Sequence, residues 1–418
     1  MELSRFGERF TARTGILGLM EDLGEALNTN EHMCMLGGGN PALIPELGRL
    51  WRGRMLEILN NGEEFEHLVG CYDTPKGNQA FLEALAGLLH REYGWEISHR
   101  NIAITNGSQT AFFLLLNLFG GTTGTGQKKK ILFPLCPEYI GYADQSIEPD
   151  SFITYRPVIE EQGHRTFKYR IDFSRLEISD DVGAICVSRP TNPTGNVITD
   201  DELFNLSTLA ESAGIPLMVD NAYGLPFPGI IFEDIHPLWN EHMILGMSLS
   251  KIGLPSVRNG IVVAREEIIE AISAMNAICS LSIGSIGQVM LEPMVSSGEI
   301  IKISREIVRP YYLKRAAQAV EWLHQGLSGT CDYSVHKSEG AFFLWIWFKD
   351  LPIDTYRLYE RLKRRNVLVI PGEYFFFDKS EPWSHRNECI RLTYSQHEDD
   401  VKLGIEILAE EVREIQRE

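Results

Sequence analysis

The stretch "MILGMSLSKIGLPSVR", residues 243–258, joins an apolar run to a short segment rich in serine, glycine and proline. The run "MILGM" has the length and composition of a buried strand, and the polar segment after it carries Lys251 and Arg258. In open parallel sheets covered by helices, ligands bind beyond the carboxyl ends of the strands. The stretch therefore predicts a buried strand that ends at a binding crevice, with Lys251 close to the strand's end.

Other short apolar runs between residues 100 and 265 have the same form. They are "NIAIT" (101–105), "KILFP" (130–134), "GAICVS" (183–188), "IPLMVD" (215–220) and "GIVVA" (260–264). Helical patterns separate several of them, such as residues 200–213, where Asp200 can cap the helix start and Gly214 can end it. This alternation predicts an α/β fold with a mostly parallel sheet covered by helices on both faces.

Polar residues follow four of these runs. The segments are Asn106 to Gln109, Arg189 to Gly195, Asp220 to Tyr223 and Ser248 to Arg258. Because the carboxyl ends of parallel strands meet at one edge of a sheet, we expect the four segments to converge on one crevice.

The final third of the chain predicts a smaller α+β domain. Its strands are "GAFFLWIWF" (340–348), "NVLVIPG" (366–372) and "CIRLTYS" (389–395), with helices at 354–365 and 398–416 and a joining helical stretch near 296–325. We expect an N-terminal segment (1–55) that contains "MLGGGNP" and packs with the small domain, a large domain (56–310) and a small domain (311–418).

Composition excludes several classes of partner. The net charge of −18 over 418 residues argues against nucleic acid and anionic membranes. No apolar run is long enough to span a bilayer, and the charged start "MELSRFGERF" lacks the apolar core of a signal peptide, so a cytoplasmic location is expected. The seven cysteines form no CxxC pair or His/Cys cluster, and no metal site is predicted. "GGTTGTGQKK" (120–129) is not a P-loop, because Gln127 follows the glycines where the motif requires lysine.

The converging residues match the needs of a pyridoxal phosphate site. The amine of Lys251 can form a Schiff base with a carbonyl, and the cofactor supplies one. Asp220 can keep the ring nitrogen protonated, Asn192 and Tyr223 can hydrogen-bond the ring oxygen, and Tyr139 can cover the ring. Each residue also has a structural interpretation alone: a surface lysine, a helix cap, or half-buried aromatic packing.

The same segments offer partners for two anionic groups. Gly107 and Ser108 open an apolar helix, where a phosphate is favoured, and Ser248 and Arg258 flank the lysine. Arg391 could hold a substrate carboxylate with two hydrogen bonds, although a structural salt bridge is an equal alternative.

Taken in order, "RPTNPTG" (189–195), "DNAY" (220–223) and "SLSK" (248–251) with Arg258 resemble the fold-type I, class I and II aminotransferases. The resemblance extends over essentially the whole chain and includes "YDTPKGNQAFLEAL" (72–85) and "VIPGEYF" (369–375). It implies a pyridoxal 5'-phosphate enzyme and a homodimer with shared active sites.

The resemblance also implies a role for each matched residue. Lys251, Asp220 and Tyr223 would be catalytic; Asn192, Tyr139, Gly107, Ser108, Gln109, Ser248 and Arg258 would join them in holding the cofactor, with Tyr72 reaching the partner subunit's phosphate; and Gly38, Gly39, Asn192 and Arg391 would bind the substrate.

Within the family, "FPLCPEYIGYAD" (133–144) and "DNAYGLPFPGIIF" (220–232) are similar to members that act on valine and pyruvate. This implies a ping-pong transamination from L-valine to pyruvate through a Lys251 Schiff base, giving 3-methyl-2-oxobutanoate and L-alanine. An aliphatic pocket is expected near "GILGLM" (15–20) and "YIGY" (139–142). The alternatives are an aminotransferase for other aliphatic or aromatic amino acids, a lyase with the same cofactor, and a non-catalytic regulator.

Two positions depart from the family pattern. Ser256 stands where many members have glycine, and this difference takes away no group that the reaction needs. Arg189 stands where many have an uncharged residue, and it is either a structural ion-pair partner or a selector of the keto acid.

Overall fold

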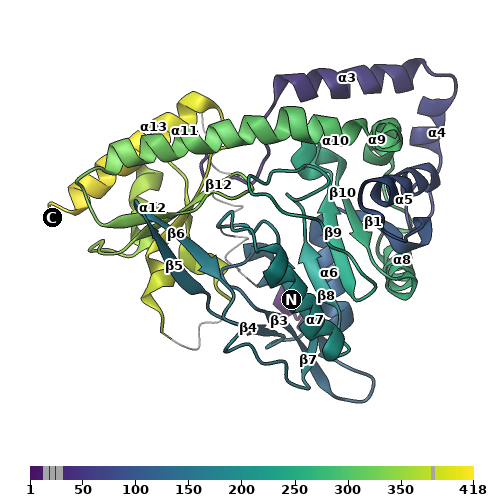
Figure 1. The fold of residues 1–418 in the computed structure, drawn as a ribbon, viewed down its shortest axis with the longest axis horizontal. Coiled ribbons are helices and arrows are strands. Elements are labelled where there is room, and N and C mark those ends of the chain that lie inside the picture. The colour runs from purple at the N-terminus through teal and green to yellow at the C-terminus, as the bar shows by residue number, and fades with distance from the viewer. Residues whose placement is uncertain (13–17, 19–23, 25–31, 378–381) are drawn as a thin grey trace.

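The computed structural model describes residues 1–12, 18, 24, 32–377 and 382–418, and it contains two sheets flanked by helices (Figure 1). The larger sheet has eight strands in the order β1-β10-β9-β8-β7-β3-β2, with β4 paired to β3. These strands are β1 (Ile102–Asn106), β2 (Gly121–Thr122), β3 (Lys128–Phe133), β4 (Phe152–Thr154), β7 (Val182–Ser188), β8 (Leu217–Asp220), β9 (Met243–Ser248) and β10 (Asn259–Val263). All six strands predicted in this part of the chain are confirmed.

Most of the larger sheet is parallel, as predicted. Parallel pairing joins β9, β8, β7, β3 and β4. Strand β10 is antiparallel to both of its neighbours, β9 and β1. Residues 249–258 between β9 and β10 form only short turns, and a parallel crossover needs a longer connection. The turn that carries Lys251 therefore reverses the chain direction at the carboxyl end of β9.

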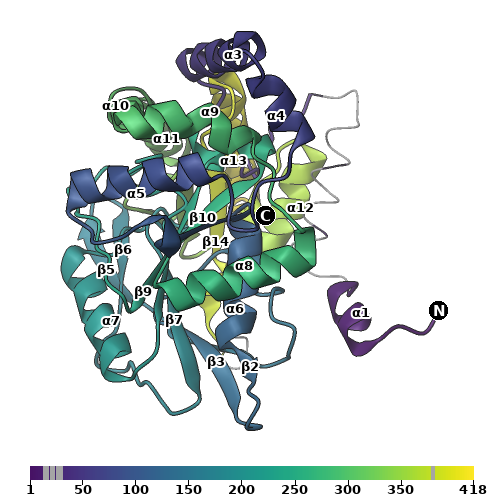
Figure 2. The ribbon, with the colours of Figure 1, turned by 90° about the vertical axis from the view of Figure 1, so that its right-hand side faces the viewer.

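Helices cover both faces of this sheet. Helix α6 (Ser108–Phe119) packs on β1, β10, β9 and β3, α7 (Asp200–Ser212) packs on β7 and β8, and α8 (Glu266–Ser280) packs on β1. Figure 2 shows α7 on one side of the sheet and α6 and α8 on the other. The side chains of Phe112, Leu115 and Leu116 on α6 are buried, which places much of the apolar core beneath this helix.

The N-terminus of α7 corrects one prediction. Thr199, and not Asp200, is the N-cap: its hydroxyl accepts from Glu202 N, and Glu202 accepts from Thr199 N in return. Asp200 is the first helical residue, and its carboxylate is occupied by the guanidinium of Arg189 at 2.5 Å. Because Arg189, on another segment, pairs with the Asp200 carboxylate, the neighbouring Thr199 caps the helix.

The second sheet has six strands in the order β13-β14-β12-β11-β6-β5. They are β5 (Val158–Gly163), β6 (Thr166–Arg170), β11 (Tyr333–His336), β12 (Phe343–Phe348), β13 (Ile370–Pro371) and β14 (Cys389–Thr393). The strands predicted at 340–348 and 389–395 are confirmed, whereas only two residues of 366–372 form a strand. Strands β5 and β6 were not predicted; they lie within the range expected for the large domain, yet β6 pairs with β11. The domain bounds stay a prediction.

The helices predicted around the second sheet are also present. Helices α12 (Thr355–Arg364) and α13 (Glu398–Ile415) match 354–365 and 398–416. The joining stretch consists of α9 (Ile286–Ser297), α10 (Glu299–Ile303), a π-helical turn (Ser304–Val308) and α11 (Arg309–Leu327). Gly298, with φ +79°, separates α9 from α10. No helix in the described ranges is long and apolar enough to cross a bilayer.

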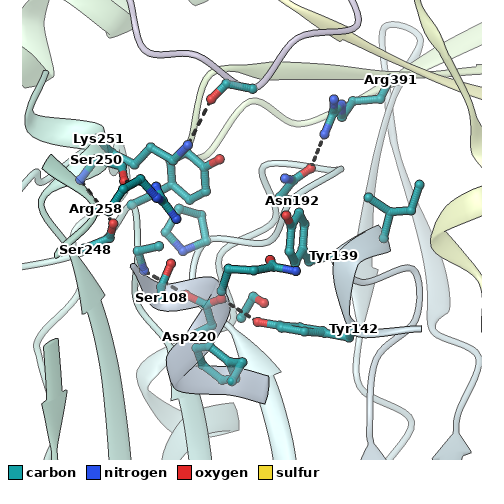
Figure 3. A pocket seen from close by; sticks show the side chains of 18 of the residues that line it. Ser108, Tyr139, Tyr142, Asn192, Asp220, Ser248, Ser250, Lys251, Arg258 and Arg391 are labelled. Carbon is teal, nitrogen blue, oxygen red and sulfur yellow. Dashed lines mark hydrogen bonds between the residues drawn. The ribbon is translucent and has the colours of Figure 1, made fainter. Parts of the chain in front are cut away.

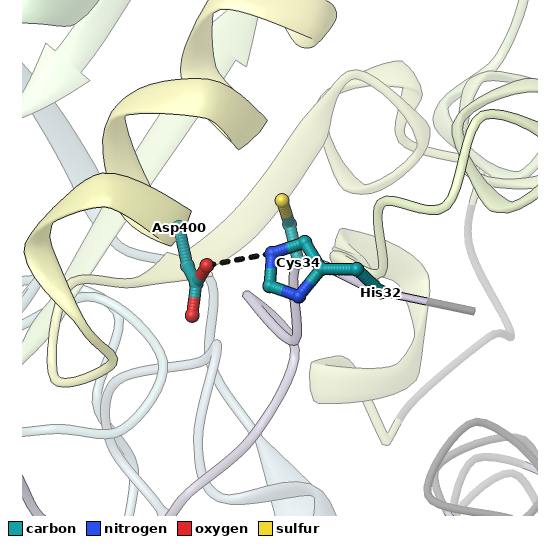
Figure 4. A group of neighbouring side chains, drawn as sticks. All are labelled: His32, Cys34 and Asp400. Atoms are coloured by element: carbon teal, nitrogen blue, oxygen red, sulfur yellow. Dashed lines mark ion pairs between the residues drawn. The ribbon is translucent and has the colours of Figure 1, made fainter. Parts of the chain in front are cut away.

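The N-terminal part of the chain contacts both sheets. It contributes α1 (Arg5–Phe10), α3 (Pro45–Asn60), α4 (Glu64–Gly70) and α5 (Gln79–Tyr93). Cys34 pairs with Val367, and Leu36 O accepts from Thr393 N at 2.8 Å, so residues 34–36 lie along the second sheet. His32 Nε2, beside Cys34, lies 2.8 Å from Asp400 Oδ1 on α13 (Figure 4). These contacts fix the start of "GGGNP" (37–41).

Candidate active site

A cavity of about 230 Å³ opens where β7, β8 and β9 of the larger sheet end and where β14 of the second sheet approaches them (Figure 3). Its lining consists of Gly37, Gly39, Ser108, Gln109, Phe112, Tyr139, Ile140, Tyr142, Ser188, Pro190, Asn192, Asp220, Ala222, Tyr223, Ser248, Ser250, Lys251, Arg258 and Arg391. All four predicted polar segments contribute to this cavity, so the expected convergence at the carboxyl edge is confirmed.

Lys251 lies on a single 3₁₀ turn (Ser250–Ile252) directly after β9, and Gly253 with φ +94° ends that turn. Its Nζ donates to Gly39 O at 2.9 Å and lies 5.2 Å from the centre of the Tyr223 ring. Burial, with the positive charge of Arg391, lowers the pKa of the Lys251 amine to about 8. About a tenth of the amine is therefore neutral, and so nucleophilic, at pH 7.

Asp220 is the last residue of β8 and lies at the inner end of the cavity. Its Oδ1 accepts from Ala222 N at 3.0 Å, and its Oδ2 accepts from the hydroxyl of Tyr142. Burial raises the pKa of the Asp220 carboxyl, and the hydrogen bonds from Tyr142 and Ala222 oppose that rise. This carboxylate can pair with a cationic ring nitrogen.

An anion cradle lies at the start of α6. Gly107 has φ +80°, and a Cβ added there would lie 2.1 Å from Arg258 Nη2, so the guanidinium occupies the space that a side chain would fill. Ser108 opens the helix, and Ser248 and Ser250 also line the cavity, with Arg258 Nη1 3.5 Å from Ser250 Oγ. In the described part of the chain no carboxylate forms an ion pair with Arg258. A helix N-terminus, serine hydroxyls and an arginine that has no carboxylate partner among the described residues fit a phosphate group.

Arg391 enters the cavity from β14 of the second sheet. Its Nη1 donates to Asn192 Oδ1 at 2.6 Å and its Nη2 to Gly37 O at 2.6 Å. The guanidinium lies 4.3 Å from the centre of the Phe343 ring, and burial lowers the pKa of Arg391 to about 10. Its buried Nε has no hydrogen-bond partner within the described residues. A cation with an unused donor fits the carboxylate of a small substrate.

The cavity contains most of the site residues that the sequence predicted. Those in its lining are Gly39, Ser108, Gln109, Tyr139, Asn192, Asp220, Tyr223, Ser248, Lys251, Arg258 and Arg391. Gly38 lies between two lining glycines, and Gly107 lies beneath Arg258. Tyr72 is 85% exposed and is not part of the lining, so its predicted contact with a partner subunit stays a prediction.

Sequence reasoning missed several lining residues and one buried neighbour. Tyr142 and Ser250 lie within segments that were singled out, yet neither was chosen. Glu138, one residue before Tyr139, is fully buried, and its carboxylate accepts from Ser188 N at 2.8 Å and Ser188 Oγ at 2.6 Å. Burial raises the pKa of Glu138 to about 8. The only signal for Glu138 and Tyr142 was their place near Tyr139, and the only signal for Ser250 was its place beside Lys251.

The structure decides between the two interpretations of Arg189. Its guanidinium donates to Asp200 Oδ1, to Ile198 O at 2.8 Å and to His236 O at 3.0 Å, and it does not line the cavity. The structural ion pair is confirmed. Ser256 lies in the exposed turn Pro255–Val257, also outside the lining.

Part of the expected substrate pocket falls outside the described residues. Of "GILGLM" (15–20), only Gly18 is described. Of "YIGY" (139–142), Tyr139, Ile140 and Tyr142 line the cavity.

Comparison with known proteins shows the family and the fold of the chain. The family model of aminotransferase class I and II matches residues 66–408. Valine–pyruvate aminotransferase of Escherichia coli K12 is 49% identical over 413 residues, which cover 99% of this chain and 98% of that protein. The crystal structure of valine–pyruvate aminotransferase from Salmonella typhimurium LT2 is 48% identical, with a TM-score of 0.89 over 97% of this chain and all of that one. Aspartate aminotransferase from Thermus thermophilus, at 20% identity and a TM-score of 0.77, covers 99% of this chain and all of its own and shares the fold.

Proposed function

The chain belongs to the class I and II aminotransferases, and we propose that it transfers the amino group of L-valine to pyruvate, giving 3-methyl-2-oxobutanoate and L-alanine. The observation that carries the proposal is the placement of the Lys251 amine in one cavity with an anion cradle and the Arg391 guanidinium. Similarity over the full length to valine–pyruvate aminotransferases of two bacteria supports the choice of substrates.

Members of this family depend on pyridoxal phosphate, and the cavity fits that cofactor. When bound, the cofactor accepts the amino group and draws electrons from the substrate's α-carbon. Ser108, Ser248 and Arg258 would hold its phosphate, Asp220 would hold the proton on its ring nitrogen, and Asn192 and Tyr223 would hydrogen-bond its ring oxygen. Tyr139 would cover its ring.

Lys251 would move the proton in both halves of the reaction. Its neutral amine would take the proton from the α-carbon of valine and deliver it to the cofactor carbon that receives the amino group. With pyruvate the same amine moves the proton in the reverse direction, so the cycle is ping-pong. A pKa near 8 suits a group that must act as base and then as acid near neutral pH.

Arg391 would bind the carboxylate that both substrates share, with Asn192 and the backbone of residues 37–39 at the same end. The Ile140 and Pro190 side chains give this cavity apolar surface for an aliphatic side chain. Such a surface separates neighbouring aliphatics by only about 1–3 kcal/mol per methylene. We expect alanine and 2-aminobutyrate to react as well.

A product assay tests the proposal. The protein, loaded with pyridoxal phosphate and mixed with valine alone, should release 3-methyl-2-oxobutanoate in an amount equal to that of the protein, and pyruvate should restore turnover. Lys251→Ala should release none. Release of carbon dioxide or ammonia would indicate a lyase, and a preference for aspartate or tyrosine over valine in a panel of amino donors would exclude the substrate assignment.

We also propose that the protein is a homodimer. Large apolar side chains are exposed around Tyr72: Val69 (62%), Ile278 (86%), Leu281 (60%) and Ile286 (44%). Hydrogen bonds from Asn276 Nδ2 to Pro75 O and from Ser285 to Asp73 hold these segments together on one surface. Several large exposed apolar side chains on neighbouring segments are typical of subunit contacts. The cytoplasmic location stays a prediction.

A further inference from the structure

We infer that Tyr142 is a positioning residue for Asp220, one that keeps the carboxylate ionised and oriented toward the cofactor's ring nitrogen. The inference rests on the proposed function. Tyr142 lies at the end of a single 3₁₀ turn (Ile140–Tyr142), and its hydroxyl donates to Asp220 Oδ2 at the inner end of the cavity (Figure 3). The two residues are 78 positions apart in the sequence, so the fold, and not a local motif, brings them together.

Two donors hold the carboxylate from different directions. Ala222 N donates to Oδ1 at 3.0 Å, and the Tyr142 hydroxyl donates to Oδ2. With one donor on each oxygen, the plane of the carboxylate is fixed. Each bond also favours the charged form, which burial alone would disfavour. If the carboxylate became neutral, it could no longer hold a proton on the ring nitrogen by charge.

The phenol itself is held by aromatic packing. Tyr142 is 1% exposed, and its ring centre lies 5.2 Å from that of Phe112, 5.3 Å from Tyr139 and 5.7 Å from Phe133. A side chain packed in this way has little freedom to turn its hydroxyl elsewhere. The bond to Asp220 is thus preformed before any ligand enters.

Other titratable groups surround the pair without replacing this bond. Glu138 and Cys186 are buried near Tyr142 and Asp220, and Lys251 faces Asp220 from the cavity. The carboxylate of Glu138 is engaged by Ser188. Among the described residues, Tyr142 is therefore the one side chain with a hydrogen bond to Asp220.

The alternative is that Asp220 serves only as the hydrogen-bond acceptor for the buried hydroxyl of Tyr142. In that case Tyr142 would contribute to stability alone. The visible absorbance of the cofactor bound at Lys251 separates the two ideas, because the pH midpoint of this band depends on the charge of the ring. A positive charge on the protonated ring disfavours protonation of the nitrogen that joins the cofactor to Lys251, and so it keeps the pH midpoint of the band low. Without the Tyr142 donor the carboxylate becomes more basic and draws the ring proton toward itself, so the midpoint should rise.

The experiment compares Tyr142→Phe with the matched control Tyr394→Phe. Tyr394 is fully buried and donates to Ala341 O at 3.0 Å, away from the cavity lining. In Tyr142→Phe we expect the midpoint to rise by about one pH unit and the affinity for pyridoxal phosphate to fall about tenfold. Changes of this size match the free energy of one hydrogen bond to a charged group. Tyr394→Phe should lower thermal stability and change neither value.

A double variant and an unnatural amino acid test whether the effect of Tyr142 passes through Asp220. In the background of Asp220→Asn, adding Tyr142→Phe should change the midpoint little, because the bond's effect passes through the carboxylate. Replacing Tyr142 by 3-fluorotyrosine keeps the ring, makes the phenol a stronger donor and should lower the midpoint, which covers the case that Tyr142→Phe does not fold.

The outcomes separate the two proposals. If wild type gives a visible band with pyridoxal phosphate and both Tyr142 replacements leave its midpoint and the affinity unchanged, the inference is overturned while the proposed function stands. If wild type gives no band at all, the proposed function fails and the inference fails with it.

Discussion

Lys251 shows how one residue's surroundings set its chemistry. An exposed lysine is almost fully protonated near pH 7, and a protonated amine is no nucleophile. Here burial and the nearby charges of Arg391 and Arg258 lower the pKa to about 8, against the opposing effect of Asp220. The residue that the sequence placed at a strand end thus gains its reactivity from burial and from two arginines, one in its own segment and one on β14 of the second sheet.

This pKa predicts how fast the protein captures its cofactor. Below pH 8 the amine is protonated and slow, so the rate of pyridoxal phosphate capture should rise with pH, with a midpoint at about 8, and then level off. Stopped-flow absorbance after mixing the cofactor-free protein with pyridoxal phosphate measures the rate. A midpoint near 10.5, the value of an ordinary lysine, would contradict the environment described above.

Gly107 offers a second prediction at the scale of one residue. Gly107→Ala places a Cβ where the Arg258 guanidinium now lies and forces a side chain onto φ +80°. Because Arg258 is flexible, it should move away, and we expect at least a tenfold loss of cofactor affinity, equal to about 1.4 kcal/mol, measured by equilibrium dialysis.

The matched control for Gly107 is Gly94→Ala. Gly94 has φ +69° and ψ 19°, the left-handed helical region, at the end of α5 with open space around it, whereas Gly107 has φ +80° and ψ 160°. Gly94→Ala therefore tests a side chain at positive φ without the contact, and its backbone strain is the milder of the two. Gly94→Ala should lose about 1 kcal/mol of unfolding free energy and Gly107→Ala more, and only Gly107→Ala should lose affinity. Equal affinities in the two variants would show that Arg258 is not part of the phosphate cradle.

At the scale of elements, a buried ion pair joins the loop that carries Asn192 to the second sheet. Lys168 on β6 donates to the carboxylate of Glu339 and to Val197 O at 2.9 Å, and Val197 N donates to Glu339 Oε2 at 2.9 Å. Both charged side chains are 2–3% exposed. The loop after β7 is therefore fixed by β6, one of the strands that the sequence did not predict.

Removing one partner of this pair should be costly. Lys168→Met leaves the Glu339 carboxylate buried with Lys337 as its remaining cation, and we expect a loss of about 3 kcal/mol in unfolding free energy, measured with urea. Adding Glu339→Gln should recover part of the loss, because the amide can still accept from Val197 N. Lys349→Met, which breaks a more exposed pair with Glu161 at 2.7 Å, is the control and should cost less than about 1 kcal/mol.

The elements that could be predicted are those whose pattern is local. Strands such as Val182–Ser188 and Met243–Ser248 are buried on both faces and read as continuous apolar runs. Strand β5 could not be found, because five of its six residues are exposed or polar and it forms an edge of its sheet. The Thr199 cap was misassigned because the ion pair that occupies Asp200 comes from another segment.

For the whole molecule, the same distinction separates the site residues. Lys251, Asp220 and Arg258 follow apolar runs, and the rule for parallel sheets brings such positions together. Nothing local links Tyr142 to Asp220 or Glu138 to Ser188, because those contacts exist only once the turn after β3 has packed across β7 and β8. The proposed substrates likewise came from resemblance and from relatives, since Gly18 is the one described residue of the segment 15–20.

The proposed dimer is a property of the whole molecule and gives the last prediction. Ile278 and Leu281 are 86% and 60% exposed at the end of α8, and burying two such side chains contributes roughly 1.5–3 kcal/mol each. The double substitution Ile278→Asp and Leu281→Asp would place two charges in the contact, and we expect a monomer in light scattering. Leu403→Asp, at a 41% exposed leucine on α13, is the control and should leave the mass of a dimer.

The monomer should also bind the cofactor more weakly, because Tyr72 would no longer reach the partner subunit's phosphate. Tyr72→Phe in the intact dimer isolates that contact: it removes a single hydroxyl and should reduce affinity for pyridoxal phosphate by about tenfold while the mass stays that of a dimer. A wild-type protein that is monomeric at micromolar concentration, or a monomeric variant with unchanged cofactor affinity, would show that the cavity of one chain is complete without a second copy.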